Sequence, residues 1–528
     1  MPNTVTHLLQ AVAVSATAFF VGCSNSTSPG GGGGNSPLPP AAGSEKLTVV
    51  VLVVDSLMPD EIGASTPNLE ALKAAGTFYP ESRAMFSAET IPNHVAMMTG
   101  VVPARNGIPT NNFIDFLAQP EPEERDLSLP EELTANTLFT WLKQECVSSG
   151  TAPELRVGAV LSKKYLYEIF EGDAANAERA NRNPLVNNLQ PDEYWDPTSS
   201  PAYLPSPDEH TVDLATMQEV LSRLPNVDFM FVNLGDVDRA AHAFDQVGRT
   251  AVLPATDTQV GLLVQQLQDA GRWANTVMIV VSDHGMDFSL NNPLGAVSTQ
   301  PTLDALGACF APMTAVQNGG TNSLVINNRS LPLADQQAAL RATRACLLGE
   351  QDCASLCAGT TRPANADGIV AAWYTRDDAQ DPAGNMPASI RSRHPNLGDL
   401  VLVAADGVKF SEPNLAGNAI PGNHGHLETI HNTMLVTGGV PWLKAGNVVA
   451  PSIADPGPLD RLPEQSENID VAATVAWLFG LQLSAGDFPD GQGFDGRVLG
   501  EAFSQFDGNP NPAPPSNCGF LPAAARGQ

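Results

Sequence analysis

The chain is poor in basic residues. Of its 528 residues only 27 are Lys or Arg, against 57 Asp or Glu, and the formal net charge is −30. A field of this sign repels the phosphate backbone of nucleic acids, so we expect no nucleic-acid binding. The same surplus of carboxylates favours divalent cations wherever acidic side chains gather.

The N-terminal region lacks an apolar run long enough to cross a bilayer. Residues 8–22 have the length of a signal-peptide core. The last three residues of this run and the cysteine that follows resemble a bacterial lipoprotein cleavage box, Phe20-Val21-Gly22-Cys23. The pattern departs from that box because Phe20 stands where Leu is usual and no Lys or Arg precedes the run. We expect a signal peptide over 1–22 and a lipid anchor on Cys23, or, as the alternative, a signal peptide without lipid.

A flexible segment follows this anchor. Residues 23–45 are rich in Gly, Ser and Pro, which is typical of a tether. The expected location is therefore outside the cytoplasm, periplasmic or at the cell surface. The lipid on Cys23 is the only membrane contact that we expect.

Cysteine is scarce, and its spacing does not indicate a zinc site. The seven cysteines are Cys23, Cys146, Cys309, Cys346, Cys353, Cys357 and Cys518. Cys353 and Cys357 do not have the usual CxxC spacing, and no second pair with a nearby His accompanies them. With Cys23 acylated, an even number remains, which favours three disulfides in an exported protein. The clustering predicts a disulfide-bonded insertion around residues 305–360, and it leaves the connectivity open.

Four continuous apolar runs indicate strands that are buried on both faces of a parallel sheet. They are residues 47–54, 229–234, 276–282 and 400–405. Amphipathic helices are expected between strands at residues 67–76, 211–224 and 256–271. This alternation predicts an α/β fold with a central, largely parallel sheet and helices on both of its faces.

Two stretches interrupt the alternation. Residues 113–155 and 290–395 are rich in Pro, Asn and Gly and lack long periodic runs. We expect both to be insertions that form a cap over the functional edge of the sheet. The folded domain is expected over residues 46–505, and residues 506–528 are expected to be a tail that is held only if Cys518 is bridged.

Carboxylates follow three of the apolar runs, and two of these strand ends also carry a histidine. A single Asp after a strand is more often a turn or cap residue. Since ligands bind at the carboxyl ends of parallel strands, however, several such ends predict one site. With a histidine from the glycine-flanked segment GNHGH (422–426), three Asp and three His are available, enough for two zinc-type sites. They are Asp55, Asp238, His242, Asp283, His284 and His424.

The order of these residues resembles that of the type I phosphodiesterase/nucleotide pyrophosphatase family of the alkaline phosphatase superfamily. The resemblance extends from about Leu47 to about Phe503. It includes TPNLEALKAAG (66–76), TIPNHVAMMTGVVPARNGI (90–108) and FDGRVLGEAF (494–503). It implies an alkaline-phosphatase-like fold.

The resemblance also implies a role for each residue. Thr90, which is otherwise an ordinary helix cap, would be the nucleophile, and Asn111 would hold a phosphoryl oxygen. Two divalent ions, most simply zinc, are implied. One would be held by Asp238, His242 and His424, and the other by Asp55, Asp283 and His284, with Thr90 bridging or facing it. His94 is expected to support the site rather than to bind metal.

The implied reaction is the hydrolysis of phosphate esters, either phosphodiester or nucleotide pyrophosphate bonds, through a phospho-threonine intermediate. The substrate would be a small-molecule phosphate ester or a nucleotide. The segment around Thr90 lacks the Cys or Ser and the Arg of a formylglycine sulfatase motif.

The choice of ester depends on a second segment, GAVLSKKYLYEIF (158–170). It resembles the segment in which phosphonoacetate hydrolases and some phosphate monoesterases carry Lys-x-Lys or Lys-x-Arg, two cations that hold a dianion. Here Lys163 takes the first place, as a substrate-binding residue, and Tyr165 the second, which favours a singly charged diester. The alternative for Lys163 and Lys164 is a solvated surface position. A phosphate monoesterase, a phosphonoacetate-hydrolase-like enzyme and a non-catalytic surface lipoprotein remain open.

Overall fold

The computed structural model describes residues 46–522 with several short gaps. The gaps are residues 119–120, 148–154, 173–185, 187, 207–208, 289–294, 412–421, 453–456, 458 and 460. The expected signal peptide, Cys23 and the tether lie outside the described residues. Within the described part of the chain, no helix is long and apolar enough to cross a membrane.

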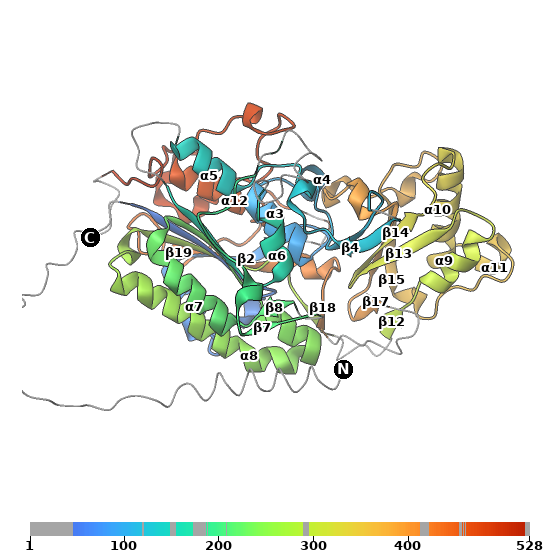
Figure 1. The fold of residues 1–528 in the computed structure, drawn as a ribbon, viewed down its shortest axis with the longest axis horizontal. Helices are drawn as coiled ribbons and strands as arrows, with labels where there is room; N and C mark the ends of the chain where they lie inside the picture. The colour runs from blue at the N-terminus through green and yellow to red at the C-terminus, as the bar shows by residue number, and fades with distance from the viewer. Residues whose placement is uncertain are drawn as a thin grey trace, which may run out of the picture.

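An eight-stranded mixed sheet forms the centre of the molecule (Figure 1), in the order β20-β2-β19-β10-β1-β9-β5-β6. Its strands are β1 (Thr48–Val54), β2 (Thr77–Arg83), β5 (Val157–Leu161), β6 (Glu193–Trp195), β9 (Phe229–Leu234), β10 (Thr276–Val281), β19 (His431–Gly438) and β20 (Asn447–Val448). The run from β10 to β6 is parallel, and β19 is antiparallel to β10. The predicted, largely parallel sheet is confirmed.

The unbroken apolar run of β1 contributes to two cores. Val49, Val51 and Val53 pack in one core, and the residues between them pack in the other. The first core includes residues of α3 (Thr90–Thr99), α5 (Leu138–Val147), α6 (Lys164–Ile169) and α12 (Asp470–Phe479). The second includes residues of α2 (Pro67–Ala75), α7 (Asp213–Arg223) and α8 (Asp236–Asp269). Because side chains alternate across a strand, a strand covered on both faces is apolar at every position.

The helix that follows β9 is longer than the sequence pattern indicates. The prediction covers only residues 256–271, whereas α8 begins at Asp236 and bends at Asp245, whose φ is 60°. Gly248 and Pro254 interrupt the apolar pattern of its first half, which is why only the second half was predicted. The other two predicted helices correspond to α2 and α7.

A smaller, four-stranded antiparallel sheet lies to one side of the main sheet (Figure 1, right). It consists of β13 (Met313–Asn318), β14 (Thr321–Ile326), β15 (Ile369–Tyr374) and β16 (Leu400–Ala404), with α9 (Gln300–Gly307), α10 (Leu333–Leu347) and α11 (Cys353–Leu356) in the same region. This sheet has a core of its own, which includes Leu324, Leu340 and Leu402. The region formed by this sheet and its helices contains most of the segment expected to be an insertion, residues 290–395.

The prediction that residues 400–405 form a strand of the parallel sheet is wrong. β16 pairs antiparallel with β14 and β15 in the smaller sheet. Its alternate residues again belong to two different cores, with Leu402 in one and Val401 and Val403 in the other. A continuous apolar run therefore reports burial on both faces and says nothing about the direction of the neighbouring strands.

The remaining elements are short. They are α4 (Pro103–Asn106) and the paired strands β3 (Asn112–Asp115) with β4 (Glu123–Asp126), β7 (Tyr203–Leu204) with β8 (His210–Thr211), β11 (Asp287–Phe288) with β18 (Gly422–Asn423), and β12 (Gly295–Val297) with β17 (Val408–Phe410).

Three disulfides join the described cysteines: Cys146–Cys518, Cys309–Cys357 and Cys346–Cys353. The predicted number and the predicted disulfide-bonded insertion are both confirmed, and they fit an exported protein. The first bridge holds the C-terminal tail on α5. There the backbone N–H of Leu47 also donates to the carbonyl oxygen of Gly519, at 2.6 Å.

Replacing both Cys146 and Cys518 with Ser should lower the melting temperature more than replacing both Cys346 and Cys353. The Cys146–Cys518 bridge spans 372 residues, whereas the Cys346–Cys353 bridge spans 7. In the chain-entropy account, a bridge across a longer loop restricts the unfolded chain more. We expect a loss of about 2–5 kcal/mol for the long bridge. Calorimetry of the two double variants without reductant measures this, and equal shifts would contradict it.

Candidate functional site

Three adjacent parallel strands end at one edge of the main sheet and carry predicted site residues. Asp55 directly follows β1, and Asp283 and His284 follow β10. Asp238 lies in the first turn of α8, just after β9, with His242 one turn later. The parallel register of the three strands therefore brings these side chains to one place, as the sequence predicts.

His424 joins them from a distant part of the chain. It directly follows β18, which pairs with β11 shortly after the end of β10. This ladder holds the glycine-flanked loop against the strand ends. The ring of His424 stacks on that of His284, with 3.8 Å between their centroids.

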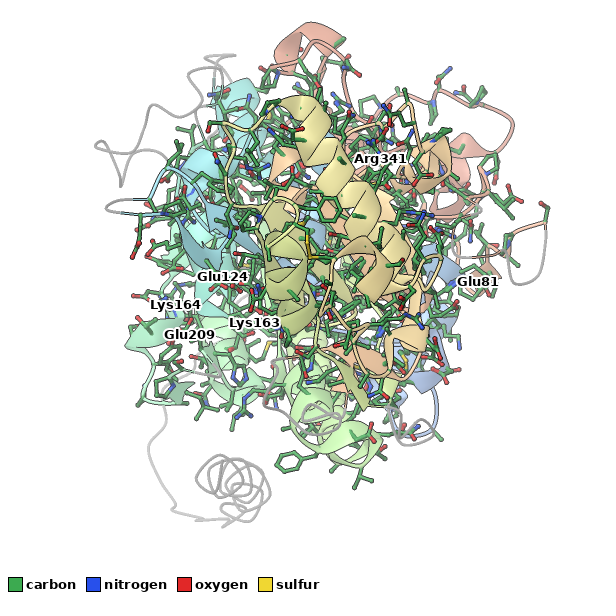
Figure 2. The ribbon with its side chains drawn as sticks, turned by 90° about the vertical axis from the view of Figure 1, so that its right-hand side faces the viewer. Glu81, Glu124, Lys163, Lys164, Glu209 and Arg341 are labelled. Atoms are coloured by element: carbon green, nitrogen blue, oxygen red, sulfur yellow. A yellow bond between two sulfur atoms is a disulfide. The ribbon has the colours of Figure 1, made fainter. Side chains whose placement is uncertain are left out.

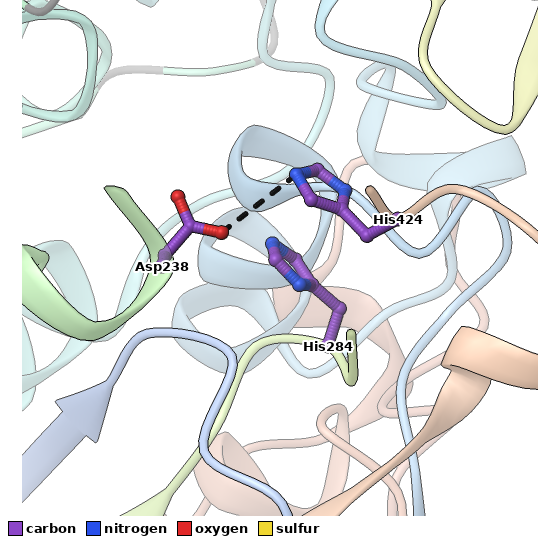
Figure 3. Close-up of side chains that lie close together, drawn as sticks. All are labelled: Asp238, His284 and His424. Atoms are coloured by element: carbon purple, nitrogen blue, oxygen red, sulfur yellow. Dashed lines mark ion pairs between the residues drawn. The ribbon is translucent and has the colours of Figure 1, made fainter. Parts of the chain in front are cut away.

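Two groups of potential metal ligands result, each with ligand atoms within 4.8 Å of one another. One consists of Asp55, Asp283 and His284, and the other of Asp238, His284 and His424. Figure 3 shows the second group, in which both imidazole rings point toward the carboxylate. Since His284 belongs to both groups, the two are immediate neighbours. His242 is in neither group, although its Nε2 lies 3.4 Å from Asp238 Oδ1.

The backbone orients all three imidazoles in the same way. The Nδ1 atoms of His242, His284 and His424 each lie 2.8–2.9 Å from a backbone carbonyl oxygen. Nδ1 must therefore donate its proton, which leaves the lone pair of Nε2 for the site. This tautomer and its backbone partner are typical of metal-binding histidines.

The three carboxylates each have an oxygen without a hydrogen bond. Asp55 Oδ1, Asp238 Oδ1 and Asp283 Oδ2 are buried and unpartnered. Burial, together with the neighbouring Asp55, raises the pKa of Asp283 well above its usual range. Burial also lowers the pKa values of His284 and His424, which keeps both rings neutral. Buried carboxylate oxygens beside neutral imidazoles form a donor set that fits divalent cations.

Thr90 lies at this centre as the first residue of α3. Its Oγ1 is 3.4 Å from His284 Nε2 and 3.4 Å from Lys163 Nζ. The N-cap position is occupied by Glu89, so the Thr90 hydroxyl does not cap the helix. The helix ends at Gly100, which adopts the left-handed conformation with φ 67°.

Asn111 is bonded to the residues on both sides of Thr90. Its Oδ1 accepts a hydrogen bond from the Ile91 N–H at 2.9 Å, and its own backbone N–H donates to Glu89 Oε2 at 2.6 Å. Because Oδ1 is engaged by a donor, the orientation of the amide is determined. Within the described part of the chain the Nδ2 donor of Asn111 has no hydrogen-bond partner, so it is free for a ligand.

The two consecutive lysines have different environments. Lys163 is only 5% exposed, and its Nζ lies 2.8 Å from Asp55 and 3.0 Å from Asp238. Although burial disfavours its charge, these carboxylates raise the pKa of Lys163 well above its usual range. Lys164 instead pairs with Glu168 and Glu209. Figure 2 labels Lys163, Lys164 and Glu209 in the same region of the molecule. The surface alternative is therefore wrong for Lys163.

Lys163 also acts on the carboxylate next to it. Burial alone would raise the pKa of Asp238, but the Lys163 ammonium holds it well below its usual range. The ammonium lies between one carboxylate of each ligand group and touches the Thr90 hydroxyl. It is therefore part of the site.

His94 and Asn233 support the site from below. His94 Nδ1 lies 2.9 Å from the carbonyl oxygen of Thr90, and its Nε2 lies 3.1 Å from Asn233 Nδ2, which also donates to Asp55 Oδ2 at 3.1 Å. Burial lowers the pKa of His94 to about 4, so the neutral ring donates from Nδ1 and accepts at Nε2. No lone pair remains for a metal, in agreement with the supporting role expected for His94.

The sequence reasoning missed Asn233 and Glu89. Asn233 is the one polar residue in the apolar run FMFVNL, which is a usable indication of a special role. Glu89 gives no such indication, because a charged residue before a helix is usually solvent-exposed. In the structure it is 1% exposed, and burial raises its pKa to about 7.

A parallel α/β sheet with these ligand groups and a helix-start Thr at its carboxyl edge defines an alkaline-phosphatase-like protein. The profile described as "Type I phosphodiesterase / nucleotide pyrophosphatase" matches residues 49–427. The chain belongs to this family.

Known relatives share part of the chain. Ectonucleotide pyrophosphatase/phosphodiesterase family member 3 of Rattus norvegicus is 26% identical over 227 residues, which is 42% of this chain and 22% of that protein. Family member 1 of Homo sapiens is 23% identical over 234 residues, 43% of this chain and 22% of that protein. The matched region thus spans about a fifth of the length of these relatives.

A solved structure supports the fold. Murine ectonucleotide pyrophosphatase/phosphodiesterase 5, in an inactive form in complex with AMP, superposes with a TM-score of 0.55 at 15% identity. The match covers 82% of this chain and 94% of the murine one. The expected alkaline-phosphatase-like fold is confirmed.

Removing His284 should reduce metal binding more than removing His424. His284 Nε2 belongs to both ligand groups, whereas His424 belongs to one. We expect His424→Ala to keep about half of the zinc of the wild type and His284→Ala to keep less. Metal analysis, together with the rise in melting temperature on adding zinc, measures this. His431→Ala is the control, since its ring pairs with Glu81 outside both groups, and equal zinc content in the two site variants would contradict the prediction.

Proposed function

We propose that this chain is an exported, metal-dependent phosphoric ester hydrolase that cleaves phosphodiester or nucleotide pyrophosphate bonds with Thr90 as its nucleophile. The observation that carries the proposal is the position of Thr90 Oγ1, 3.4 Å from Nε2 of His284, the residue shared by both ligand groups. Membership of the family supports this reaction. The lipid anchor on Cys23 is part of the proposal and is supported by the residues around the cleavage box.

In the proposed reaction Thr90 Oγ1 attacks the phosphorus atom while the bond to the leaving oxygen breaks on the opposite side. Water then hydrolyses the resulting phospho-threonine and restores the hydroxyl. When bound, divalent ions supply the positive charge that lowers the pKa of the Thr90 hydroxyl and stabilises the leaving oxygen. The ligands that we assign are Asp238, His242 and His424 for one ion, and Asp55, Asp283 and His284 for the other, with zinc as the metal that suits this donor set. Because His284 also lies in the group of Asp238 and stacks on His424, its removal would disturb the first ion as well.

The chain supplies donors for the phosphoryl oxygens. Asn111 Nδ2 is held toward the site because its Oδ1 is already bonded to the Ile91 N–H. The N-terminus of α3 carries a partial positive charge at the position of Thr90. Lys163 Nζ lies 3.4 Å from the Thr90 hydroxyl and adds a full positive charge. Donors fixed before the reaction stabilise the charge that develops in the transition state.

The charge of the site favours a diester. Among the described residues Lys163 is the one Lys or Arg that pairs with the carboxylates of the site, while Lys164 pairs with Glu168 and Glu209. Tyr165, in the second place of the motif, remains neutral because burial raises its pKa. A single ammonium matches the one negative charge of a phosphodiester better than the two of a monoester. A nucleotide substrate is consistent with the AMP complex of the murine neighbour.

Thr90→Ala should abolish turnover without loss of metal. The variant removes the attacking oxygen and leaves the carboxylate and imidazole ligands in place, so kcat should fall by at least about 1,000-fold. Kinetics and metal analysis on the same preparation measure this. Thr99→Ala is a matched control in the same helix, because the Thr99 hydroxyl bonds only to the carbonyl oxygen of Val95. Full activity of Thr90→Ala would refute the proposed nucleophile.

A comparison of substrates tests the proposed ester class. We expect kcat/KM to be at least about tenfold higher for bis-p-nitrophenyl phosphate than for p-nitrophenyl phosphate, and activity on a nucleotide pyrophosphate to be lost with a chelator. A preference for the monoester would favour the monoesterase alternative. Turnover of phosphonoacetate alone would favour a phosphonoacetate-hydrolase-like enzyme. If none is cleaved in a chelator-sensitive way, the non-catalytic lipoprotein becomes the better interpretation.

A further inference from the structure

The turn between β13 and β14 extends from the smaller sheet to the candidate site. Residues 318–321 include Gly319, whose φ is +65°, and Gly320, where a Cβ atom would lie 2.5 Å from the backbone nitrogen of His426. The N–H of Gly320 donates to the carbonyl oxygen of His424 at 2.7 Å. The turn therefore packs directly on the loop that holds a ligand residue.

The same turn also contacts the nucleophile side. Asn318 exchanges two hydrogen bonds with the backbone of Asn112, at 3.0 and 3.3 Å. The hydroxyl of Thr321 donates to Glu89 Oε1 at 3.1 Å. One short segment of the smaller sheet thus reaches both sides of the site.

Glu89 links this turn to the catalytic pair. Its Oε2 accepts hydrogen bonds from the Asn111 N–H at 2.6 Å and from the Thr110 hydroxyl at 3.2 Å. Asn111 in turn accepts the Ile91 N–H. The residues on both sides of Thr90 are therefore hydrogen-bonded to Asn111. Glu89 extends this network to Thr321 of the smaller sheet.

Burying the carboxyl group of Glu89 destabilises the folded protein. The carboxylate is 1% exposed, and no cation within the described part of the chain forms an ion pair with it. A buried carboxyl group without a cation destabilises a protein unless its hydrogen bonds repay the loss of water. Here the partners are Asn111 and Thr110 beside the nucleophile, Thr321 in the turn, and the neighbouring Ser87.

We propose that Glu89 is a positioning residue that, together with Thr321, fixes Thr90 and Asn111 relative to each other and couples them to the smaller sheet. Its effect on rate rests on the proposed function, since productive geometry tolerates only small displacements. Its effect on the backbone at Asn111 does not depend on any activity.

Three variants test this proposal. Glu89→Ala removes all the acceptors, Glu89→Gln keeps the shape and one acceptor oxygen, and Thr321→Val removes only the hydroxyl that joins the smaller sheet. Thr314→Val is the matched control, because its hydroxyl bonds to Asn327 on the same sheet but away from the site. We expect amide hydrogen exchange at Asn111 to become about tenfold faster in Glu89→Ala, intermediate in Thr321→Val, and unchanged in Thr314→Val.

Kinetics distinguish positioning from a general structural role. Glu89→Ala should lower kcat by about tenfold or more with a smaller change in KM and with unchanged metal content, and Glu89→Gln should restore most of the loss. If Glu89 acts through Asn111, Glu89→Ala in an Asn111→Ala background should lower kcat by less than about twofold. An equal loss in both backgrounds, or loss of metal, would overturn the proposal.

The two hypotheses fail in different ways. A wild-type protein without esterase activity refutes the proposed function, while the exchange at Asn111 still tests the role of Glu89. An active enzyme in which Glu89→Ala leaves both the exchange and kcat unchanged refutes the positioning role alone. If Glu89→Ala does not fold, Thr321→Val decides, and wild-type exchange and kcat in that variant would count against the proposal.

Discussion

Three carboxylates buried together are the constraint on which the rest of the site depends. Asp55, Asp238 and Asp283 each retain an oxygen without a hydrogen bond, although the first two also contact the Lys163 ammonium. Burying charge costs several kcal/mol per ion, and one ammonium pairs with only two of the three carboxylates, so this centre is unfavourable for the protein by itself. The surrounding fold tolerates it because the two-sided apolar strands behind it leave the side chains little freedom to separate. The same unpartnered oxygens form a donor set that fits a divalent cation.

The supporting groups have one feature in common, which is that they hold the imidazoles of the site in a neutral, oriented form. Backbone carbonyls fix the imidazole tautomers, and burial lowers the pKa values of His284 and His424, so proton and metal do not compete at Nε2 near neutral pH. His94 is fixed by the same means but uses both nitrogens. The hydrogen bonds alone thus distinguish a histidine whose Nε2 lone pair is free from one that uses both nitrogens.

Much of the site was predictable, because apolar runs mark strands and parallel strands share an edge. The shared edge predicts that Asp55, Asp238 and Asp283 lie together, and the family resemblance adds Thr90 and Asn111. Residues 400–405 are the exception, since an apolar run reports two-sided burial and not strand direction. Glu89 could not be predicted, because its partners include residues of two separate segments, 110–111 and 321. The disulfide pairs likewise depend on how distant segments are brought together. Long-range contacts of this kind leave no local pattern in a single sequence.

The smaller sheet therefore has more than a covering role. A cap that only shapes a pocket would contact substrate and little else, but the turn at 318–321 bonds to the ligand loop through Gly320 and to the nucleophile side through Thr321 and Asn318. Its two glycines permit this approach, because a side chain at Gly320 would collide with the His426 backbone. A displacement of the smaller sheet would consequently alter the distance between the two sides of the site.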